Sequence, residues 1–197
     1  MFIQVIQGPC SDAETLRDLA ERWTIDLGPG AVGWLGTTYG ITDDGRFIGV
    51  VRFTDGDAAE RNSNRAEQSG WWAEAEKCFS GPVTFHNSEE VMTFLHGGSD
   101  DAGFVQVIQG KVRDGERLRE MMARSDELGT YRSDVIGGTV AFADDGTFTE
   151  TVAFTSEAAA REGEATQMPE EFMSVWEEST SDLSYYDLRD PWFASPR

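Results

Sequence analysis

The sequence is short of basic residues and lacks any long apolar run. Only 16 Lys and Arg stand against 36 Asp and Glu, which gives a formal net charge of −20 over 197 residues. Because such a charge repels phosphate backbones and anionic lipid, we expect neither nucleic acid nor a membrane as a partner. No segment approaches the ~20 apolar residues of a membrane-spanning helix. Residues 1–8 also lack the basic region of a signal peptide, so we expect a cytoplasmic protein.

Cysteine and histidine are equally scarce. The chain has Cys10, Cys78, His86 and His96, with no C-x-x-C pair and no cluster of Cys, His or carboxylates at metal-ligand spacing. We therefore expect reduced thiols, no metal site and no cofactor. No G-x-S-x-G elbow or P-loop occurs, so nothing supports a hydrolase of that kind or a nucleoside triphosphatase.

An internal repeat organises what the sequence does contain. The segment FIQVIQG at 2–8 returns as FVQVIQG at 104–110, and TDDGRF at 42–47 returns as ADDGTF at 143–148. The chain is therefore predicted to be a tandem duplication of a unit of about 100 residues. The predicted boundaries are a first repeat at 1–88, a linker at 89–102, a second repeat at 103–190 and a C-terminal tail at 191–197.

Each repeat is predicted to have the element order βαββαβ. Residues 2–8 are a short apolar run that ends in glycine, which favours a strand. Residues 11–14 (SDAE) form a capping box with Ser11 as the N-cap of the first helix. The remaining elements, in chain order, are a helix stop at 28–30, a hairpin turn at 43–45, a helical region from 56 to 79 with a break at 69–70, and a last strand at 83–86.

This order is the ferredoxin-like plan, an α+β fold with both helices on one face of an antiparallel sheet. The strand at 2–8 is apolar on both sides, so the other face of the sheet also needs cover. We therefore predict two tandem ferredoxin-like βαββαβ repeats whose antiparallel sheets pack into one α+β barrel. Because such a barrel closes within one chain, we expect a monomer or a homodimer of tandem chains.

The segment FTDGDAAERNSN at 53–64 resembles a family motif. It is similar to the strand-to-helix segment of the antibiotic-biosynthesis-monooxygenase-like group of the dimeric α+β barrel superfamily. The resemblance implies a barrel in which the usual partner is fused, and cofactor-independent oxygenation of an aromatic or phenolic substrate. The polar helix residue of that family, often His, is matched by Asn62 in the first repeat and by Gly163 in the second. That departure implies that catalysis is confined to the first repeat.

Differences between the repeats mark candidate pocket residues. Phe47, Val51 and Phe53 are retained in the second repeat, which predicts that their face of the strand packs on the helices. The opposite face diverges and carries Arg52, so it is predicted to line the barrel interior. Arg52 would there need an anionic partner, a carboxylate or a ligand, and the alternative is an arginine at the barrel rim that reaches solvent. At the same offset, His86 matches Asp187.

The candidate site lies in the first repeat. The candidate catalytic residues are His86 as the base, with Asn62 and Arg52 to hold a substrate anion. The candidate ligand-binding residues are Gln4, Trp34, Asn64 and Trp72 in the first repeat, together with Gln106, the equivalent of Gln4 in the second.

Two classes of function remain open at this point. The first is a cofactor-independent monooxygenase with a small-molecule pocket in the first repeat. The second is a non-catalytic ligand-binding or structural module, because a fold does not determine a function. Haem binding, with His86 as the axial ligand, is a further alternative that the resemblance to barrel relatives implies.

Overall fold

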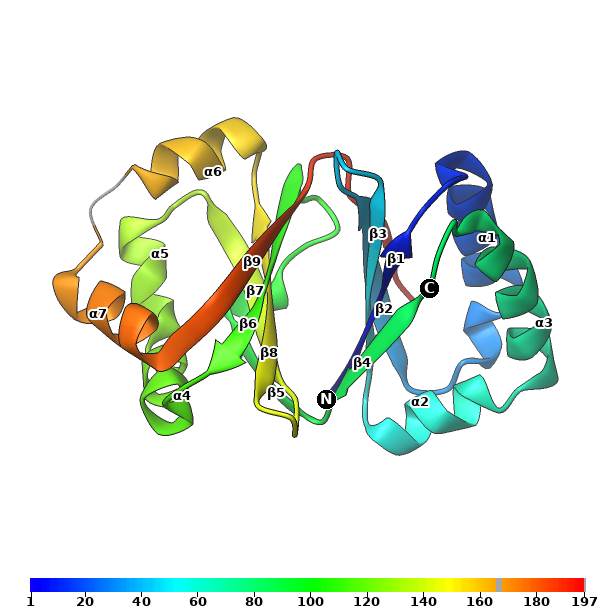
Figure 1. The fold of residues 1–197 in the computed structure, drawn as a ribbon, viewed down its shortest axis with the longest axis horizontal. Coiled ribbons are helices and arrows are strands. Elements are labelled where there is room, and N and C mark those ends of the chain that lie inside the picture. The colour runs from blue at the N-terminus through cyan, green and yellow to red at the C-terminus, as the bar shows by residue number, and fades with distance from the viewer. Residues whose placement is uncertain (166–167, 197) are drawn as a thin grey trace. The chain divides into compact units, whose positions relative to one another are not determined.

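The structure is a computed structural model that describes residues 1–165 and 168–196. The chain divides into two compact units (Figure 1). Unit 1 holds residues 1–89 together with 191–196, and unit 2 holds residues 90–190. None of the described helices is both long and apolar enough to cross a membrane.

Unit 1 is a five-stranded antiparallel sheet with helices on one face (Figure 1). Its core lies between this face and the helices and includes Leu16, Trp23, Phe47 and Phe53. Its strands, in the spatial order β10-β2-β3-β1-β4, are β1 (Phe2–Pro9), β2 (Trp34–Ile41), β3 (Arg46–Phe53), β4 (Thr84–Ser88) and β10 (Trp192–Ala194). Its helices are α1 (Ala13–Asp26), α2 (Gly56–Ser63) and α3 (Ala66–Ala75), with the 3-10 turns η1 (Gly28–Gly30) and η2 (Glu76–Cys78).

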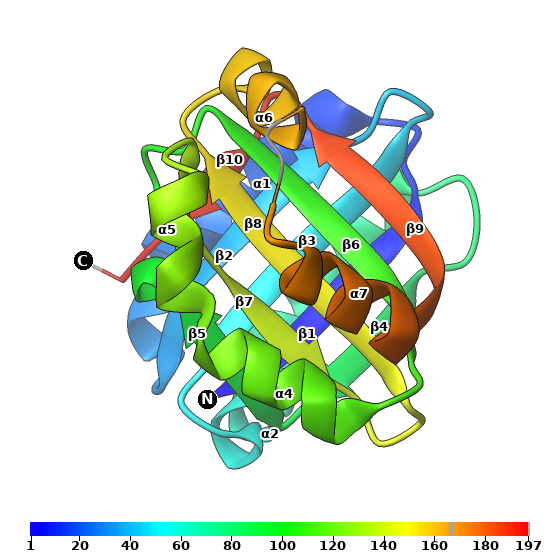
Figure 2. The same cartoon turned by 90° about the vertical axis from the view of Figure 1, so that its left-hand side faces the viewer.

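Unit 2 repeats this plan, and Figure 2 shows its helices lying over one face of its sheet. Leu118, Met122, Phe148 and Phe154 belong to its core. Its strands, in the spatial order β5-β7-β8-β6-β9, are β5 (Glu90–Phe94), β6 (Phe104–Val112), β7 (Val135–Phe142), β8 (Thr147–Phe154) and β9 (Thr180–Leu188). Its helices are α4 (Gly115–Ala123), α5 (Leu128–Tyr131), α6 (Glu157–Glu164) and α7 (Glu170–Ser179), with η3 (Leu95–Gly97) and η4 (Ser125–Glu127).

The predicted α+β class and the tandem ferredoxin-like repeats are confirmed. Both hairpins turn at the repeated Asp-Asp-Gly, where Gly45 and Gly146 have φ values of 79° and 80°. Only glycine adopts this left-handed backbone without strain. The retained residues Phe47, Val51 and Phe53 do pack on the helices, as predicted. The closure of the two sheets into one barrel stays a prediction.

Two local predictions were wrong. The N-cap of α1 is Asp12 and not Ser11, because the Asp12 carboxylate accepts the Thr15 amide at 3.0 Å while the Ser11 hydroxyl donates to the Cys78 carbonyl. The second helical region breaks at residues 64–65 rather than at 69–70, since Arg65 takes an extended conformation before α3 begins.

The segments predicted as linker and tail each contribute a strand. Residues 90–94 form β5, which pairs with β7 at the edge of the unit 2 sheet. Residues 192–194 form β10, which pairs with β2 and places the Trp192 ring on Tyr39 with a centroid separation of 5.6 Å. The sheet of unit 1 is therefore built from segments that are far apart in the sequence.

One glycine-rich segment has the spacing of a dinucleotide-binding motif. Residues 28–33 read G-P-G-A-V-G. They follow α1 and lead into β2, with η1 between the two. A dinucleotide site needs the reverse order, a strand that turns into a helix whose N-terminus meets the phosphates, so this match carries no such function.

Candidate functional site

Each unit contains a cavity between its own sheet and its own helices. The cavity of unit 1 has a volume of about 70 Å³, and that of unit 2 has a volume of about 210 Å³. A cavity of roughly 150 Å³ lined by apolar groups is large enough for benzene. The cavity of unit 2 can therefore hold a bicyclic ring system, whereas that of unit 1 is too small for one ring.

Aromatic rings fill most of the interior of unit 1. Trp23 meets Trp34 edge to face at a centroid distance of 4.9 Å and Trp71 at 6.4 Å. The indole N–H of Trp23 donates to the Gln68 carbonyl oxygen at 2.6 Å, and that of Trp71 donates to the Leu19 carbonyl at 2.9 Å. These donors are satisfied inside the protein, so a ligand would gain little from them.

Three of the predicted residues line the cavity of unit 1. They are Asn62, Gln4 and Trp72. Asn62 is 7% exposed, and its carbonyl oxygen accepts a hydrogen bond from the Arg65 guanidinium at 3.0 Å. The Gln4 amide donates to Asn87 at 2.9 Å.

Four further predicted residues lie elsewhere in unit 1. Trp34 is buried beside Trp23 and donates to the Thr37 hydroxyl at 3.0 Å, and Asn64 is exposed at the end of α2. Arg52 lies on the face of β3 that the helices do not cover, where it donates to the Thr38 hydroxyl at 2.9 Å. His86 is exposed on β4 and lies 3.5 Å from the Gln7 amide.

The strand register also corrects the predicted counterpart of His86. His86 pairs with Val5, and the equivalent Val107 pairs with Tyr186. The match of His86 with Asp187 was therefore wrong, because β4 and β9 are offset by one residue less than β3 and β8. The histidine lies on the face opposite the helices. The residues described as lining the two cavities include no histidine, so neither cavity offers the axial ligand of the haem alternative.

The cavity of unit 2 contains a buried carboxyl group that the sequence prediction missed. Glu150 on β8 faces the helices, as do Val152 and Phe154, and it is only 8% exposed. Burial raises the pKa of this carboxyl to about 7. Within residues 1–165 and 168–196, no group makes a hydrogen bond or ion pair with it. A carboxyl that burial has shifted into the neutral range is suited to act as a general base.

The position of Glu150 in unit 1 is occupied by Gly49. A Cβ atom at Gly49 would lie 3.1 Å from the Phe47 ring and 3.4 Å from the Tyr39 ring. These rings occupy the space into which the Glu150 side chain extends in unit 2. Burial raises the pKa of Tyr39 to about 12, so its hydroxyl stays protonated at neutral pH.

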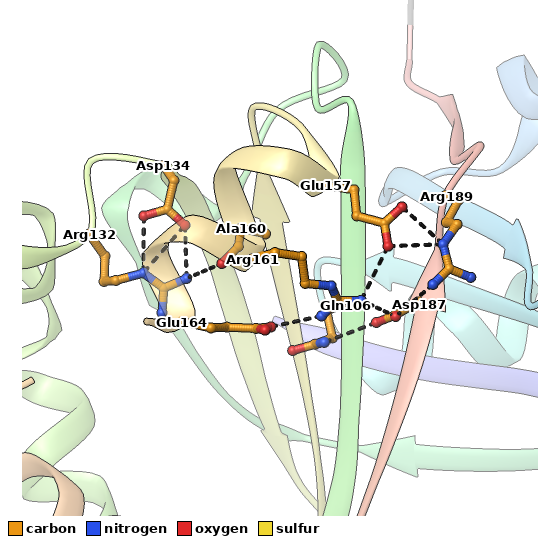
Figure 3. A network of polar contacts seen from close by, with 9 residues as sticks. All are labelled: Gln106, Arg132, Asp134, Glu157, Ala160, Arg161, Glu164, Asp187 and Arg189. Atoms are coloured by element: carbon orange, nitrogen blue, oxygen red, sulfur yellow. Dashed lines mark hydrogen bonds and ion pairs between the residues drawn. The ribbon is translucent and has the colours of Figure 1, made fainter. Parts of the chain in front are cut away.

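Gln106 lies beside Glu150 on the same face of the unit 2 sheet. Its amide nitrogen donates to Asp187 at 2.9 Å, and its side chain is 8% exposed. Asp187 also binds Arg161 and Arg189 (Figure 3). Gln106 is thus the one predicted site residue that lines the cavity of unit 2.

An ion pair that is largely shielded from solvent holds Arg132, which lines another part of the cavity. The Arg132 guanidinium binds the Asp134 carboxylate at 2.8 Å, with the two side chains 16% and 11% exposed. Gly163 stands here in place of Asn62. A Cβ at Gly163 would lie 2.5 Å from the Asp134 carboxylate, so the glycine lets the ion pair approach α6.

The remaining wall of this cavity is apolar and soft. It is formed mainly by Met121, Met122, Met168, Phe172, Met173 and Trp176. Methionine side chains are flexible and polarizable, so they adapt to ligands of different outline. Among the described residues, no group of three or more His, Cys, Asp or Glu could hold a metal ion.

Solved structures match this architecture over its whole length. A candidate monooxygenase from Lactobacillus acidophilus matches 98% of this chain and 96% of its own, with a TM-score of 0.72 and 15% identity. An anthrone oxidase-like protein matches 98% and 93%, with a TM-score of 0.68 and 12% identity. A ferredoxin-fold protein from Listeria monocytogenes, related to antibiotic biosynthesis monooxygenases, matches 100% and 95%, with a TM-score of 0.53 and 10% identity.

The chain shares their fold. At such low identities the likeness concerns the fold alone, and site residues do not transfer from these proteins. No protein-family model and no curated protein matches the sequence. The function therefore has to be argued from the cavities.

Proposed function

We propose that the cavity of unit 2 binds a neutral aromatic compound with a phenolic hydroxyl, and that the protein is a cofactor-independent monooxygenase with Glu150 as the base. The observation that carries this proposal is the buried Glu150 carboxyl in an otherwise largely apolar cavity of about 210 Å³. The sequence suggested the first repeat instead. There the cavity is about 70 Å³, and His86 does not line it.

The pKa of Glu150 supports its role as a base. An ordinary glutamate, with a pKa of about 4.3, is a weak base toward a phenol, whose pKa is about 10. Burial raises the pKa of Glu150 to about 7, which narrows that gap while leaving much of the group ionised at neutral pH.

The reaction needs only the substrate and O₂, as the bicyclic phenol 1-naphthol illustrates. Glu150 accepts the phenolic proton, and the naphtholate transfers one electron to O₂. The two radicals combine and form a C–O bond at the carbon para to the hydroxyl, and the proton on Glu150 returns to the peroxide. Loss of the proton on that carbon and cleavage of the O–O bond release water. One naphthol and one O₂ thus give one naphthoquinone and one water.

The fold is compatible with this chemistry. Its solved neighbours include candidate monooxygenases and an anthrone oxidase-like protein. These names say nothing of the residues used, so the choice of Glu150 rests on this chain alone.

The test is O₂ uptake with 1-naphthol by the unmodified chain, Glu150→Gln and His86→Ala. We expect Glu150→Gln to lower the rate by about 10²- to 10⁴-fold, the usual contribution of a general base. His86→Ala should keep the rate. Uptake should rise with pH through about 7 in the unmodified chain, because the base must be ionised.

The outcomes separate the competing functions. Loss of uptake in His86→Ala alone would favour the first-repeat site. Binding of 1-naphthol without any uptake would refute the enzyme and leave a ligand-binding module.

A further inference from the structure

The orientation of the Gln106 amide is determined by its neighbour. An ionised aspartate only accepts hydrogen bonds, so the group that faces Asp187 at 2.9 Å must be the amide nitrogen of Gln106. The carbonyl oxygen of Gln106 is then directed away from Asp187 (Figure 3). In the part of the chain that the structure describes, no group donates to this oxygen.

Asp187 is itself held by two arginines. Arg161 and Arg189 both bind the carboxylate oxygen that does not face Gln106, and Arg189 also binds Glu157 at 2.9 Å (Figure 3). Two cations on one oxygen fix the rotation of the Asp187 carboxylate. The network therefore fixes which end of the Gln106 amide is free.

Gln106 and Glu150 present two acceptors to one cavity. Gln106 lies opposite Val152 on β8, and Ile108 lies opposite Glu150, so the two polar residues are diagonal neighbours on one face of the sheet. Such neighbours are about 7–8 Å apart. Both side chains line the cavity and both are more than nine-tenths buried.

We infer that the cavity of unit 2 selects a neutral aromatic ligand with two hydrogen-bond donors, one for Glu150 and one for the carbonyl oxygen of Gln106, and that Asp187 is the positioning residue that makes Gln106 an acceptor. This inference rests on the site of the proposed function and adds a second hydroxyl to its substrate class.

The charges around the cavity argue against an anionic ligand. Glu150 and Glu164 both line it, and the charge of Arg132 is offset by Asp134 at 2.8 Å. Glu164 is itself paired with Arg161 at 2.8 Å, so an acid or a phosphate ester would meet the unpaired Glu150 carboxyl and, among the described lining residues, no uncompensated cation. Neutral hydroxyl groups avoid this repulsion and satisfy the two acceptors.

The substitution Asp187→Asn tests the orientation. The two arginines will hold the asparagine oxygen, which places its NH₂ toward Gln106. The Gln106 amide must then turn over to accept from this NH₂, and its own NH₂ will face the cavity. One acceptor of the cavity thus becomes a donor without a change of volume.

The readout is the ratio of affinities for a diol and for the parent phenol. We propose titration calorimetry without O₂, using 1,3- and 1,6-dihydroxynaphthalene against 1-naphthol. The unmodified chain should bind at least one diol about tenfold more tightly than 1-naphthol, the value of one well-made hydrogen bond. In Asp187→Asn and in Gln106→Met the ratio should fall to about one. Asp182→Asn, which removes a carboxylate that lies on the same strand, binds Lys111 at 2.9 Å and does not line the cavity, should keep the tenfold preference.

Several results would overturn the inference. Failure of the unmodified chain to bind 1-naphthol and the diols would do so, as would equal affinity for diols and parent phenol. If both Asp187→Asn and Gln106→Met kept the preference for a diol over 1-naphthol, Gln106 would not accept a hydrogen bond from the ligand. Since affinity is measured without O₂, a protein that discriminates the diols but consumes no O₂ would refute the proposed function and leave the inference standing.

Discussion

The two units share one fold but have different interiors. Equivalent positions on β2 and β7 hold Trp34 and Tyr39 in unit 1 but Val135 and Val140 in unit 2. The larger rings fill unit 1, while the smaller residues leave a cavity of about 210 Å³ around Glu150 in unit 2. One copy of a duplicated unit can therefore keep a filled core while the other accepts a cavity and a buried acid.

The largest expected effect concerns the filled interior of unit 1. Trp23 is 6% exposed and contacts Trp34 and Trp71. Trp23→Ala should lower the free energy of unfolding by about 3–5 kcal/mol, the usual cost of removing a buried aromatic ring. Trp176→Ala should cost less, because Trp176 already borders a cavity. Urea denaturation measures both, and equal losses would show that the two interiors are packed alike.

The next effect concerns the buried acid of unit 2. The carboxyl of Glu150 has a pKa of about 7 in the folded chain, against an ordinary value of 4.5 for an exposed glutamate. The folded chain therefore binds more protons than the unfolded chain between these values, and stability falls as the pH rises through this window. Above pH 7 the cost is roughly 3 kcal/mol. Glu150→Gln should raise the urea midpoint at pH 8 and leave it nearly unchanged at pH 4, and a gain of equal size at both values would contradict the shift.

The smallest expected effect is the change in stability when either of two helical glycines, one in each unit, is replaced by alanine. Gly70 lies within α3, where a Cβ would meet no atom within 4 Å, so Gly70→Ala should stabilise the chain by about 0.5–1 kcal/mol. Gly163→Ala should instead destabilise it, because the added methyl would displace the Arg132–Asp134 ion pair. Thermal unfolding of the two variants gives the sign of each change. Stabilisation of both variants would mean that the Arg132–Asp134 ion pair moves aside without a loss of stability.

The sequence predicted the fold well because the repeat carries it. The turn glycines and the retained Phe47 and Phe53 recur at a fixed offset, so each repeat gave independent support for the same strands and hairpins. The exact helix boundaries could not be predicted in this way. Ser11 and Asp12 are both good N-cap residues, and only the hydrogen bond from the Thr15 amide decides between them.

The candidate site was harder to predict. Glu150 lies on the retained face of its strand, where the neighbouring positions suggested packing alone. The signal was present as the change from Gly49 to Glu150 at the common offset. The change of register at β4 and β9 was invisible in the sequence, and so the pairing of Gln106 with Asp187 was missed.

Strand β10 has a consequence for the order in which the chain folds. Residues 90–190 contain every strand of the unit 2 sheet, whereas the unit 1 sheet lacks its edge until residues 192–194 are made. The other four strands of the unit 1 sheet are made first, so β2 exposes unpaired backbone groups until β10 follows at residues 192–194. An open edge of this kind invites pairing with other chains. The pairing of β10 with β2 covers this edge, and the stacking of Trp192 on Tyr39 holds β10 in place.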